Sequence, residues 1–401
     1  MLCFPLLASA QTSEALNIPH IPGAMKADGK LEEAFWQQAA VTEILYETNP
    51  GENLPASVRT KVYVVNSGSS FRVAFEAFDP DPKKILNPLR DRDKAYDDDT
   101  VGFQLDTFDT QQRALWFYVS ARGVQMDGTF DESRDADDDS WDAIWESGAQ
   151  LNAQGYTVEF EIPYSSLKFK HSTTPQQWSI KFQRFRPREN SFKYANVKND
   201  RNNNCNLCQQ GKIIGFANVD AGNNLLINPT FTSNYAQERY SPDQPLSSDG
   251  SVNEFGLDVT WSPNSNNTIS GTYNPDFSQI EIDGAQLNVN TNFALYYPEK
   301  RPFFLDSADF FNSPSRLVYT RNIADPDYGL RATGRIGEQT YGFFGALDSE
   351  TNILRPGPYE SYLDTIEGES TDLVGTYRYG FNETANIGTL ISLIIFTTVF
   401  F

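Results

Sequence analysis

Hydrophobic and polar residues alternate with a period of two along several short runs of the N-terminal half. Because successive side chains of a strand point to opposite faces, each run predicts a strand with one buried face. The apolar positions of these runs are Phe71, Val73, Phe75 and Ala77; Val101, Phe103 and Leu105; Leu115, Phe117 and Val119; Tyr156, Val158, Phe160 and Ile162; and Trp178, Ile180 and Phe182. Turn signals separate the runs and no long helical pattern intervenes, so we expect an antiparallel, jelly-roll-like β-sandwich.

The pattern changes near residue 221, where Asn, Ser and Gly become frequent and the candidate strands are more widely spaced. These strands place aromatic residues on one side and polar residues on the other, as outer-membrane barrel strands do. A second soluble β-domain would fit the same pattern. The candidate strands are residues 252–261, 268–274, 287–295, 328–336, 341–347 and 372–381. We therefore expect an all-β chain with a sandwich over residues 11–220 and antiparallel strands of a partial β-barrel over residues 221–401.

Composition narrows the classes of partner. The 401 residues carry a net charge of −21, which excludes nucleic acid as a partner because phosphates require Lys and Arg. Phe (29) and Tyr (19) are abundant, which favours strands over helices. The sequence holds no apolar run long enough to predict a membrane-spanning helix.

The first ten residues resemble the end of a secretory signal. Leu2 to Leu7 is a short apolar run, and Ala8-Ser9-Ala10 is an A-x-A cleavage pattern. The positively charged leader of such signals is missing, so we interpret residues 1–10 as a remnant of the signal, with a frayed apolar terminus as the alternative. This interpretation predicts an exported protein.

Two cysteines, Cys205 and Cys208, form a CxxC pair inside the Asn-rich stretch NNNCNLCQQG. A zinc site needs four ligands, and the sequence holds neither a second CxxC nor a His pair. In an exported protein we therefore expect these cysteines to form a local disulfide.

The most acidic stretch runs from Asp127 to Asp142 and holds eight carboxylates against Arg134. Carboxylates in a flexible loop suit Ca²⁺, which takes six to eight oxygen ligands, although the spacing is not that of an EF-hand. An acidic, solvated loop is the alternative. Clustering at strand ends would bring in the preceding acidic run as well. The candidate calcium ligands are Asp97, Asp98, Asp99, Asp127, Asp131, Asp135, Asp137, Asp138, Asp139 and Asp142.

Tryptophans stand beside this acidic stretch. Sugars are bound by flat aromatic faces together with carboxylates and amides that meet their hydroxyl groups. Trp141, Trp145 and Trp178 are therefore candidate carbohydrate-stacking residues, and the alternative for each is a place in the core of the sandwich.

Four stretches resemble known families. ADGKLEEAFWQQA (residues 27–39), DDDTVGFQLDTF (97–108) and WDAIWESGAQLNAQGYTVEFEIPYSSLKF (141–169) resemble carbohydrate-binding family 9-like domains. NPDFSQIEIDGAQLNVNTNFALYYPEKRPFFLDSADFF (274–311) closely resembles the barrel-entry segment of bacterial proteins that join such a sandwich to a DUF5916 C-terminal region.

This resemblance implies carbohydrate binding by an exported sandwich anchored at the outer membrane, in association with polysaccharide breakdown or uptake. It implies a polysaccharide or oligosaccharide partner, and family 9 modules contain calcium and clamp a sugar between two tryptophans. Relatives extend well beyond the C-terminus of this chain, and residues 393–401 lose the alternation, so we expect a truncated or frameshifted gene.

Two other functions remain open at this point. A glycoside hydrolase acting on O-glycosyl bonds would need two carboxylates about 5–10 Å apart, and the abundance of carboxylates does not discriminate. The sequence has no G-x-S-x-G or H-E-x-x-H motif, and His20 and His171 lie outside the acidic stretch. The second alternative is an outer-membrane transport or assembly component, in which PEKRPFF (residues 298–304) forms a rim or plug with its charges facing water.

Overall fold

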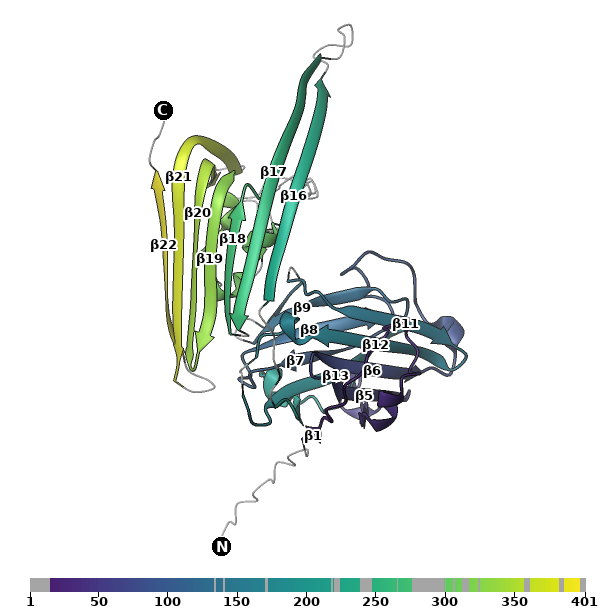
Figure 1. The fold of residues 1–401 in the computed structure, drawn as a ribbon. Coiled ribbons are helices and arrows are strands. Elements are labelled where there is room, and N and C mark those ends of the chain that lie inside the picture. Colours follow the sequence, from purple (N-terminus) through teal and green to yellow (C-terminus); the bar gives the residue numbers. More distant parts are fainter. Residues whose placement is uncertain are drawn as a thin grey trace. The chain divides into compact units, whose positions relative to one another are not determined.

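The computed structural model describes residues 15–132, 135–139, 141–169, 172–217, 219, 224–238, 247–264, 266–275, 299, 301–305, 307–311, 317–323, 325–356, 361–381 and 386–396. The chain divides into two compact units, Met1–Ala221 and Gly222–Phe401, and each is described by itself (Figure 1). The proposed signal remnant, His171 and the candidate strand 287–295 lie outside the described residues.

Two sheets form the first unit. The larger has the order β10-β9-β8-β7-β13-β14-β3-β4, with β15 also paired to β13 and β1 paired to β15. All of these pairs are antiparallel except β1 with β15. The strands are β1 (Leu16–Asn17), β3 (Tyr46–Asn49), β4 (Leu54–Pro55), β7 (Thr100–Asp106), β8 (Arg113–Ser120), β9 (Gln125–Asp131), β10 (Ala136–Asp138), β13 (Gln177–Pro187), β14 (Ser191–Ala195) and β15 (Gly211–Ile214).

The second sheet has five antiparallel strands in the order β11-β12-β6-β5-β2. They are β2 (Ala40–Glu43), β5 (Thr60–Asn66), β6 (Ser70–Phe78), β11 (Glu146–Asn152) and β12 (Gly155–Pro163). Short 3₁₀ turns connect the strands of this unit: η1 (Ala34–Gln38), η2 (Pro82–Lys84), η3 (Tyr164–Ser166) and η4 (Leu207–Gln209).

The core lies between these two sheets. The alternating apolar positions of β6 and β12 face those of β7, β8 and β13, and all except the partly buried Leu115 are almost fully buried. Phe103 of the larger sheet contacts Phe71 and Phe160 of the smaller one, with ring centroids 5.7 and 5.4 Å apart. Each such ring contributes about 1.5–3 kcal/mol by leaving water. The expected antiparallel sandwich is thus confirmed.

The second unit is one antiparallel sheet of seven strands in chain order. The strands are β16 (Asn224–Glu238), β17 (Ser247–Asn264), β18 (Asn267–Tyr273), β19 (Pro326–Ile336), β20 (Gln339–Pro356), β21 (Ser361–Gly380) and β22 (Asn386–Phe396). Within the described residues the sheet is open, and β22 continues to Phe396, past the residue where the alternation was expected to fail.

The two faces of this sheet have an unusual polarity. Along β18, Thr268, Ser270 and Thr272 are buried, whereas Ile269 and Tyr273 are exposed. Arg331 and Thr333 of β19 are likewise buried while Leu330 is exposed, whereas β22 exposes side chains on both faces. Exposed apolar side chains include Leu225, Ile227, Phe231, Phe255, Trp261, Tyr328, Leu330, Phe343, Leu347, Tyr377, Tyr379, Ile387, Ile391 and Leu393.

The buried face is covered by α1 (Pro302–Leu305), η5 (Ala308–Phe311) and η6 (Thr320–Asn322). Phe304 and Phe311 pack edge-on against Phe344 of β20. Arg301 is almost fully buried on this side and binds both oxygens of Glu299 at 2.7 Å, so these charges of the PEKRPFF motif lie away from the apolar face. Among the described helices, none has the length and apolarity needed to cross a membrane.

Candidate functional site

The strongest candidate site is the outer face of the larger sheet of the sandwich. On β7, β8 and β13 the residues between the core positions point to this face. The strand register places Lys181 beside Gln104 and Gln104 beside Trp116. In the next row, Gln183 lies beside Gly102, which lies beside Tyr118. We call Gln104, Tyr118, Lys181, Gln183, Phe185 and Gln210 the outer-face site.

Two aromatic rings lie flat on this face because glycines leave room for them. A Cβ built on Gly102 would come within 2.3 Å of the Tyr118 ring, and one on Gly128 within 2.3 Å of the Trp116 ring. Trp116 is buried in a small cluster with Leu207 and Phe130. Tyr118 stays half-buried and meets Phe185 edge-on at 5.4 Å. Tyr118 and Phe185 are therefore half-buried rings of this face that a ligand can reach.

Amides surround the Tyr118 ring. The Tyr118 hydroxyl donates to Gln183 Oε1 at 2.6 Å, and Gln210 Nε2 donates to Gln104 Oε1 at 3.1 Å. Gln210 is only 7 % exposed, yet its own Oε1 is buried and accepts no hydrogen bond from the described residues. A buried acceptor without a donor is costly.

The disulfide loop helps to build this face. Cys205 and Cys208 are joined in the structure, and the loop's backbone N–H groups at Asn206 and Leu207 donate to the Glu132 carboxylate at 2.9 and 2.8 Å. The anchored loop covers Trp116 with Leu207 and is followed directly by Gln210. The cysteine pair predicted from the sequence thus lies in a loop that shapes the outer-face site.

Two cations also lie on this face. Lys181 is 8 % exposed, and burial together with the nearby Lys193 ammonium lowers the pKa of its amine. Lys193 is exposed, sits 5.4 Å from the centre of the Phe185 ring and interacts with the Asp137 carboxylate. The face is therefore locally cationic on a strongly acidic protein.

Two of the three predicted stacking tryptophans are core residues, which corrects that prediction. Trp178 is 0 % exposed and stacks on Phe216 at 3.8 Å, while Trp145 is 6 % exposed and stacks on Phe160. Both rings lie in the core between the sheets, where no sugar can reach them. Trp141 is half-buried and packs edge-on against Phe117, also on the core side of the sheet.

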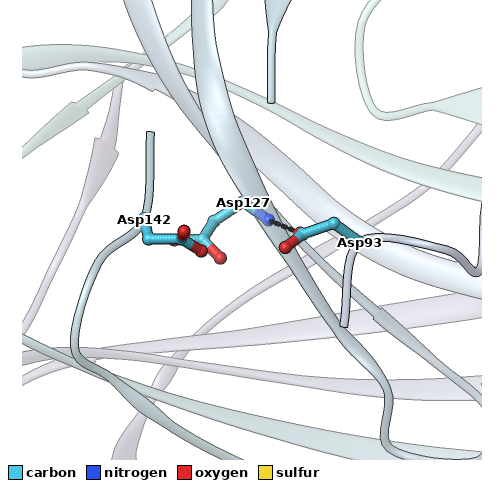
Figure 2. A group of neighbouring side chains, drawn as sticks. All are labelled: Asp93, Asp127 and Asp142. Carbon is cyan, nitrogen blue, oxygen red and sulfur yellow. Dashed lines mark hydrogen bonds between the residues drawn. The ribbon is translucent and has the colours of Figure 1, made fainter. Parts of the chain in front are cut away.

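Two carboxylates of the acidic stretch join Asp93 in a group that could hold a cation. Asp93, Asp127 and Asp142 have ligand oxygens within 4.8 Å of one another (Figure 2). Asp127 is fully buried and accepts from Ala143 N at 2.6 Å, while its own N–H donates to Asp93 Oδ1 at 3.1 Å. Burial, opposed by Arg92, raises the pKa of Asp127 to about 6.

An arginine already neutralises part of this group. Arg92 forms ion pairs with Asp127, with Asp142 at 2.9 Å and with Asp93 at 3.5 Å. The carboxyl oxygens fit a hard cation such as Ca²⁺, which would have to displace or share them with the guanidinium. Asp93 was missed as a candidate ligand, although it lies only four residues before Asp97, which was included.

The other candidate calcium ligands do not join this group. Arginines pair with several of them: Arg90 with Asp98, Arg188 with Asp99, and Arg113 with Asp131. Asp135 accepts from Asn206, Asp139 accepts from Tyr96, and Asp97 and Asp137 are exposed. Asp138 is half-buried on β10. Calcium coordination by the full predicted set is therefore wrong, because the cluster in sequence is dispersed in space.

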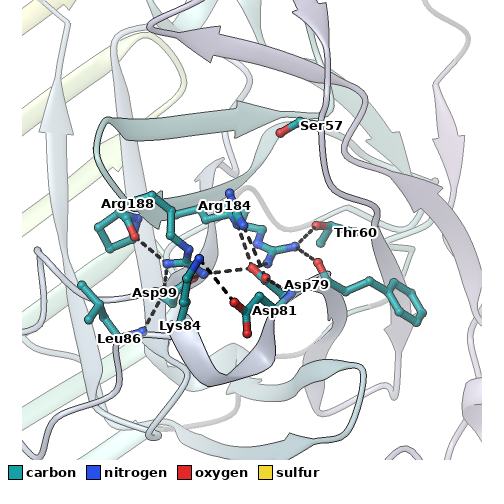
Figure 3. A network of polar contacts seen from close by, with 12 residues as sticks. Ser57, Thr60, Asp79, Asp81, Lys84, Leu86, Asp99, Arg184 and Arg188 are labelled. Carbon is teal, nitrogen blue, oxygen red and sulfur yellow. Dashed lines mark hydrogen bonds and ion pairs between the residues drawn. The ribbon is translucent and has the colours of Figure 1, made fainter.

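A buried ion network explains why Asp99 is unavailable (Figure 3). Asp79 accepts from Arg186 Nε at 2.7 Å and from Arg188 Nη2 at 2.9 Å, and Arg188 Nη1 donates to Asp99 at 2.7 Å. Although burial opposes it, the hydrogen bond from Arg186 holds the pKa of Asp79 below its usual range. Arg184 donates to the Phe78 carbonyl at 2.8 Å. The network ties β13 to the end of β6.

The motif DG…W at residues 28–36 is structural. Glu159 of β12 is fully buried and accepts from Gly29 N at 2.8 Å, Asp28 N at 3.2 Å and Trp36 Nε1 at 3.0 Å. Burial raises the pKa of Glu159 to about 7, helped by the nearby Glu33. Trp36 lies in the short 3₁₀ turn η1, which follows Glu33.

Two kinds of comparison with known proteins found matches, one to a family model and one to solved structures. A family model described as a domain of unknown function (DUF5916) matches residues 224–336. No curated protein matches the chain. A carbohydrate-binding module of family 9 from Caldicellulosiruptor kristjanssonii, solved with cellotriose, is 17 % identical, with 50 % of this chain and 94 % of that one covered and a TM-score of 0.38.

A second solved structure is a protein described as carbohydrate-binding from Bacteroides uniformis. It is 8 % identical, with 51 % of this chain and 99 % of that one covered and a TM-score of 0.41. The family model confirms the expected DUF5916 region, and a family 9 module is among the solved structures that are similar.

Proposed function

We propose that the sandwich binds carbohydrate at the outer-face site. The observation that carries this proposal is a reachable Tyr118 ring among three glutamine amides, with the buried Gln210 Oε1 left without a donor. A sugar offers apolar C–H groups to the ring and hydroxyl groups to the amides, so one ligand satisfies both. The resemblance of the sequence to family 9-like domains supports the same class of ligand.

Titration calorimetry of the full chain tests this site. Cellotriose is a suitable first probe because a family 9 module was solved with it, and xylotriose and other neutral trisaccharides extend the screen. Tyr118→Ala is expected to abolish binding while the melting temperature of the sandwich stays close to that of the wild type. The matched control is Trp141→Phe, which removes no part of the outer-face site and is expected to leave affinity unchanged. Binding that survives Tyr118→Ala and is lost in Trp141→Phe would place the site elsewhere.

We also propose that the second unit anchors the sandwich in an outer membrane. Its exposed face carries Leu330, Trp261 and many other apolar side chains, while its covered face buries Thr, Ser, Asp and Arg. An exposed apolar patch of this extent is rare in a soluble monomer. Strands that show apolar residues to lipid and polar residues to the inside have this polarity. A sandwich that binds carbohydrate at the surface of the outer membrane would take part in polysaccharide breakdown or uptake.

The group of Asp93, Asp127 and Asp142 is proposed to take up Ca²⁺. The buried Asp127 carboxyl, with its raised pKa, gains from a nearby cation that keeps it ionised. At a free cation concentration of 100 times Kd, binding would stabilise the folded sandwich by about 2.7 kcal/mol. A melt in millimolar calcium is expected to lie above one in chelator, and Asp127→Asn should remove the difference. Identical melts would contradict this role.

Glycoside hydrolysis remains an outcome to be measured. The assay incubates the chain with xylan and cellulose and counts new reducing ends. Release that disappears when particular carboxylates are changed to amides would assign an enzyme.

A further inference from the structure

One buried cation in the sandwich has no carboxylate partner. Among its described residues, the buried basic side chains are Arg72, Arg184 and Lys181. Arg72 pairs with Glu161 at 2.7 Å, and Arg184 lies 3.5 Å from Asp79. Lys181 forms neither an ion pair nor a hydrogen bond in the described part of the chain. Buried charges in proteins are normally paired, because an isolated one is costly to desolvate.

The position of Lys181 places this unpaired charge inside the outer-face site. It lies beside Gln104 across the β7–β13 pair, two residues before Gln183 on the same strand. Burial and the like charge of Lys193 both lower the pKa of its amine, so the surrounding protein disfavours the ammonium form. An anion that arrives with the ligand would reverse this penalty.

We propose that the outer-face site selects an acidic saccharide, a uronate whose carboxylate pairs with Lys181. This inference rests on the proposed carbohydrate function. Lys181 lies beside the neutral amide of Gln104, and the nearby Lys193 ammonium adds a second positive charge, which together suit a polyol that carries a carboxylate. Lysine offers a compact point charge, whereas the bidentate arginine forks that suit phosphate are here engaged with aspartates. The net charge of −21 also disfavours highly charged polyanions.

A pair of probes that differ only in charge tests the inference. Trigalacturonate and its fully methyl-esterified form are titrated into the full chain under the same conditions. The wild type is expected to bind the acid at least tenfold more tightly than the ester. Lys181→Met should reduce that ratio to about one by weakening the acid alone. Lys30→Gln, at an exposed lysine in the loop before η1, is the control for a change of net charge and should keep the ratio.

Folding of the variant is checked by its melting temperature. Lys181→Met removes an unpaired buried charge, so its melting temperature is expected to equal or exceed that of the wild type. Equal affinity of the wild type for acid and ester, or a preference retained in Lys181→Met, would overturn the uronate inference and leave carbohydrate binding intact. Failure of both these probes and all neutral sugars to bind would overturn the proposed function as well.

Discussion

The two units use the same two-residue alternation with opposite polarity. In the sandwich, Phe103 and Phe117 are buried between the sheets and their neighbours Gln104 and Tyr118 face outward. In the second unit, Ser270 is buried and Ile269 is exposed. A period of two therefore predicts a strand in either unit, but which residues face outward depends on the medium. We interpret the sandwich as the ligand-binding unit in water and the seven-stranded sheet as the unit in lipid.

The largest expected effect comes from removing a core ring of the sandwich. Trp178→Ala should destabilise this unit by about 3–5 kcal/mol, because it deletes a fully buried ring stacked on Phe216. Urea unfolding followed by near-ultraviolet circular dichroism measures the change. Tyr118→Ala on the outer face should destabilise the sandwich by less than half as much as Trp178→Ala. Equal costs would mean that the two faces of the sheet do not differ as we describe.

A charge on the exposed face of the second unit should be nearly as costly in a membrane. Leu330 is 54 % exposed near the middle of β19, and an arginine facing lipid at mid-depth costs about 2–4 kcal/mol. Leu330→Arg is therefore expected to reduce the fraction of protein that floats with lipid vesicles. The control is Leu89→Arg, at a position of the sandwich unit that is 84 % exposed. Loss of flotation in both variants, or in neither, would contradict the assignment of lipid to this face.

The sandwich alone is expected to weaken as pH rises through neutrality. The folded-state pKa of Glu159, about 7, lies above the ordinary value of 4.5. The contribution of the protonated Glu159 carboxyl to the free energy of unfolding is therefore fully present below about pH 4.5 and is lost as pH rises through 7. The total is at most about 3 kcal/mol at 1.36 kcal/mol per pKa unit. Glu159→Gln should reduce the pH dependence of the sandwich transition between pH 5 and 8 and leave the part that comes from the raised pKa of Asp127, while Glu32→Gln, at an exposed site, should not reduce it. If the wild-type sandwich instead became more stable between pH 5 and 8, and Glu159→Gln removed that gain, the predicted sign of the pH dependence would be wrong.

The strands of the sandwich could be predicted from the sequence, but the outer-face site was not. Alternation predicts where β6, β7, β8, β12 and β13 lie, because the period of a strand is local. It also places Trp178 and Phe182 on the same face, which already favours the core for Trp178. The outer-face site could have been found by the same rule, since Tyr118 and Gln183 occupy the opposite positions of those strands.

What the sequence could not supply was pairing between distant elements. The carboxylates of the acidic stretch suggested one metal site, but Arg113 and Arg92 reach them from other segments. Likewise, the three backbone and side-chain donors to Glu159 come from a segment about 130 residues away, as their sequence separations of 123 to 131 show. The reversed polarity of β18 was visible as alternation, yet only burial in the fold tells which side faces outward.

The most direct test of this contrast uses the tryptophans as reporters. Trp261 on β17 is the one tryptophan of the six in the second unit, is 45 % exposed, and lies between Leu225 and Ile269 on the apolar face. The full chain and its Trp261→Phe variant are reconstituted into vesicles with and without lipid brominated on the acyl chains. The fluorescence difference between the two proteins isolates Trp261. We predict that bromine quenches this difference and leaves the remaining emission of the variant unchanged. A difference signal that is not quenched, or equal quenching of both proteins, would contradict the assignment of opposite media to the two units.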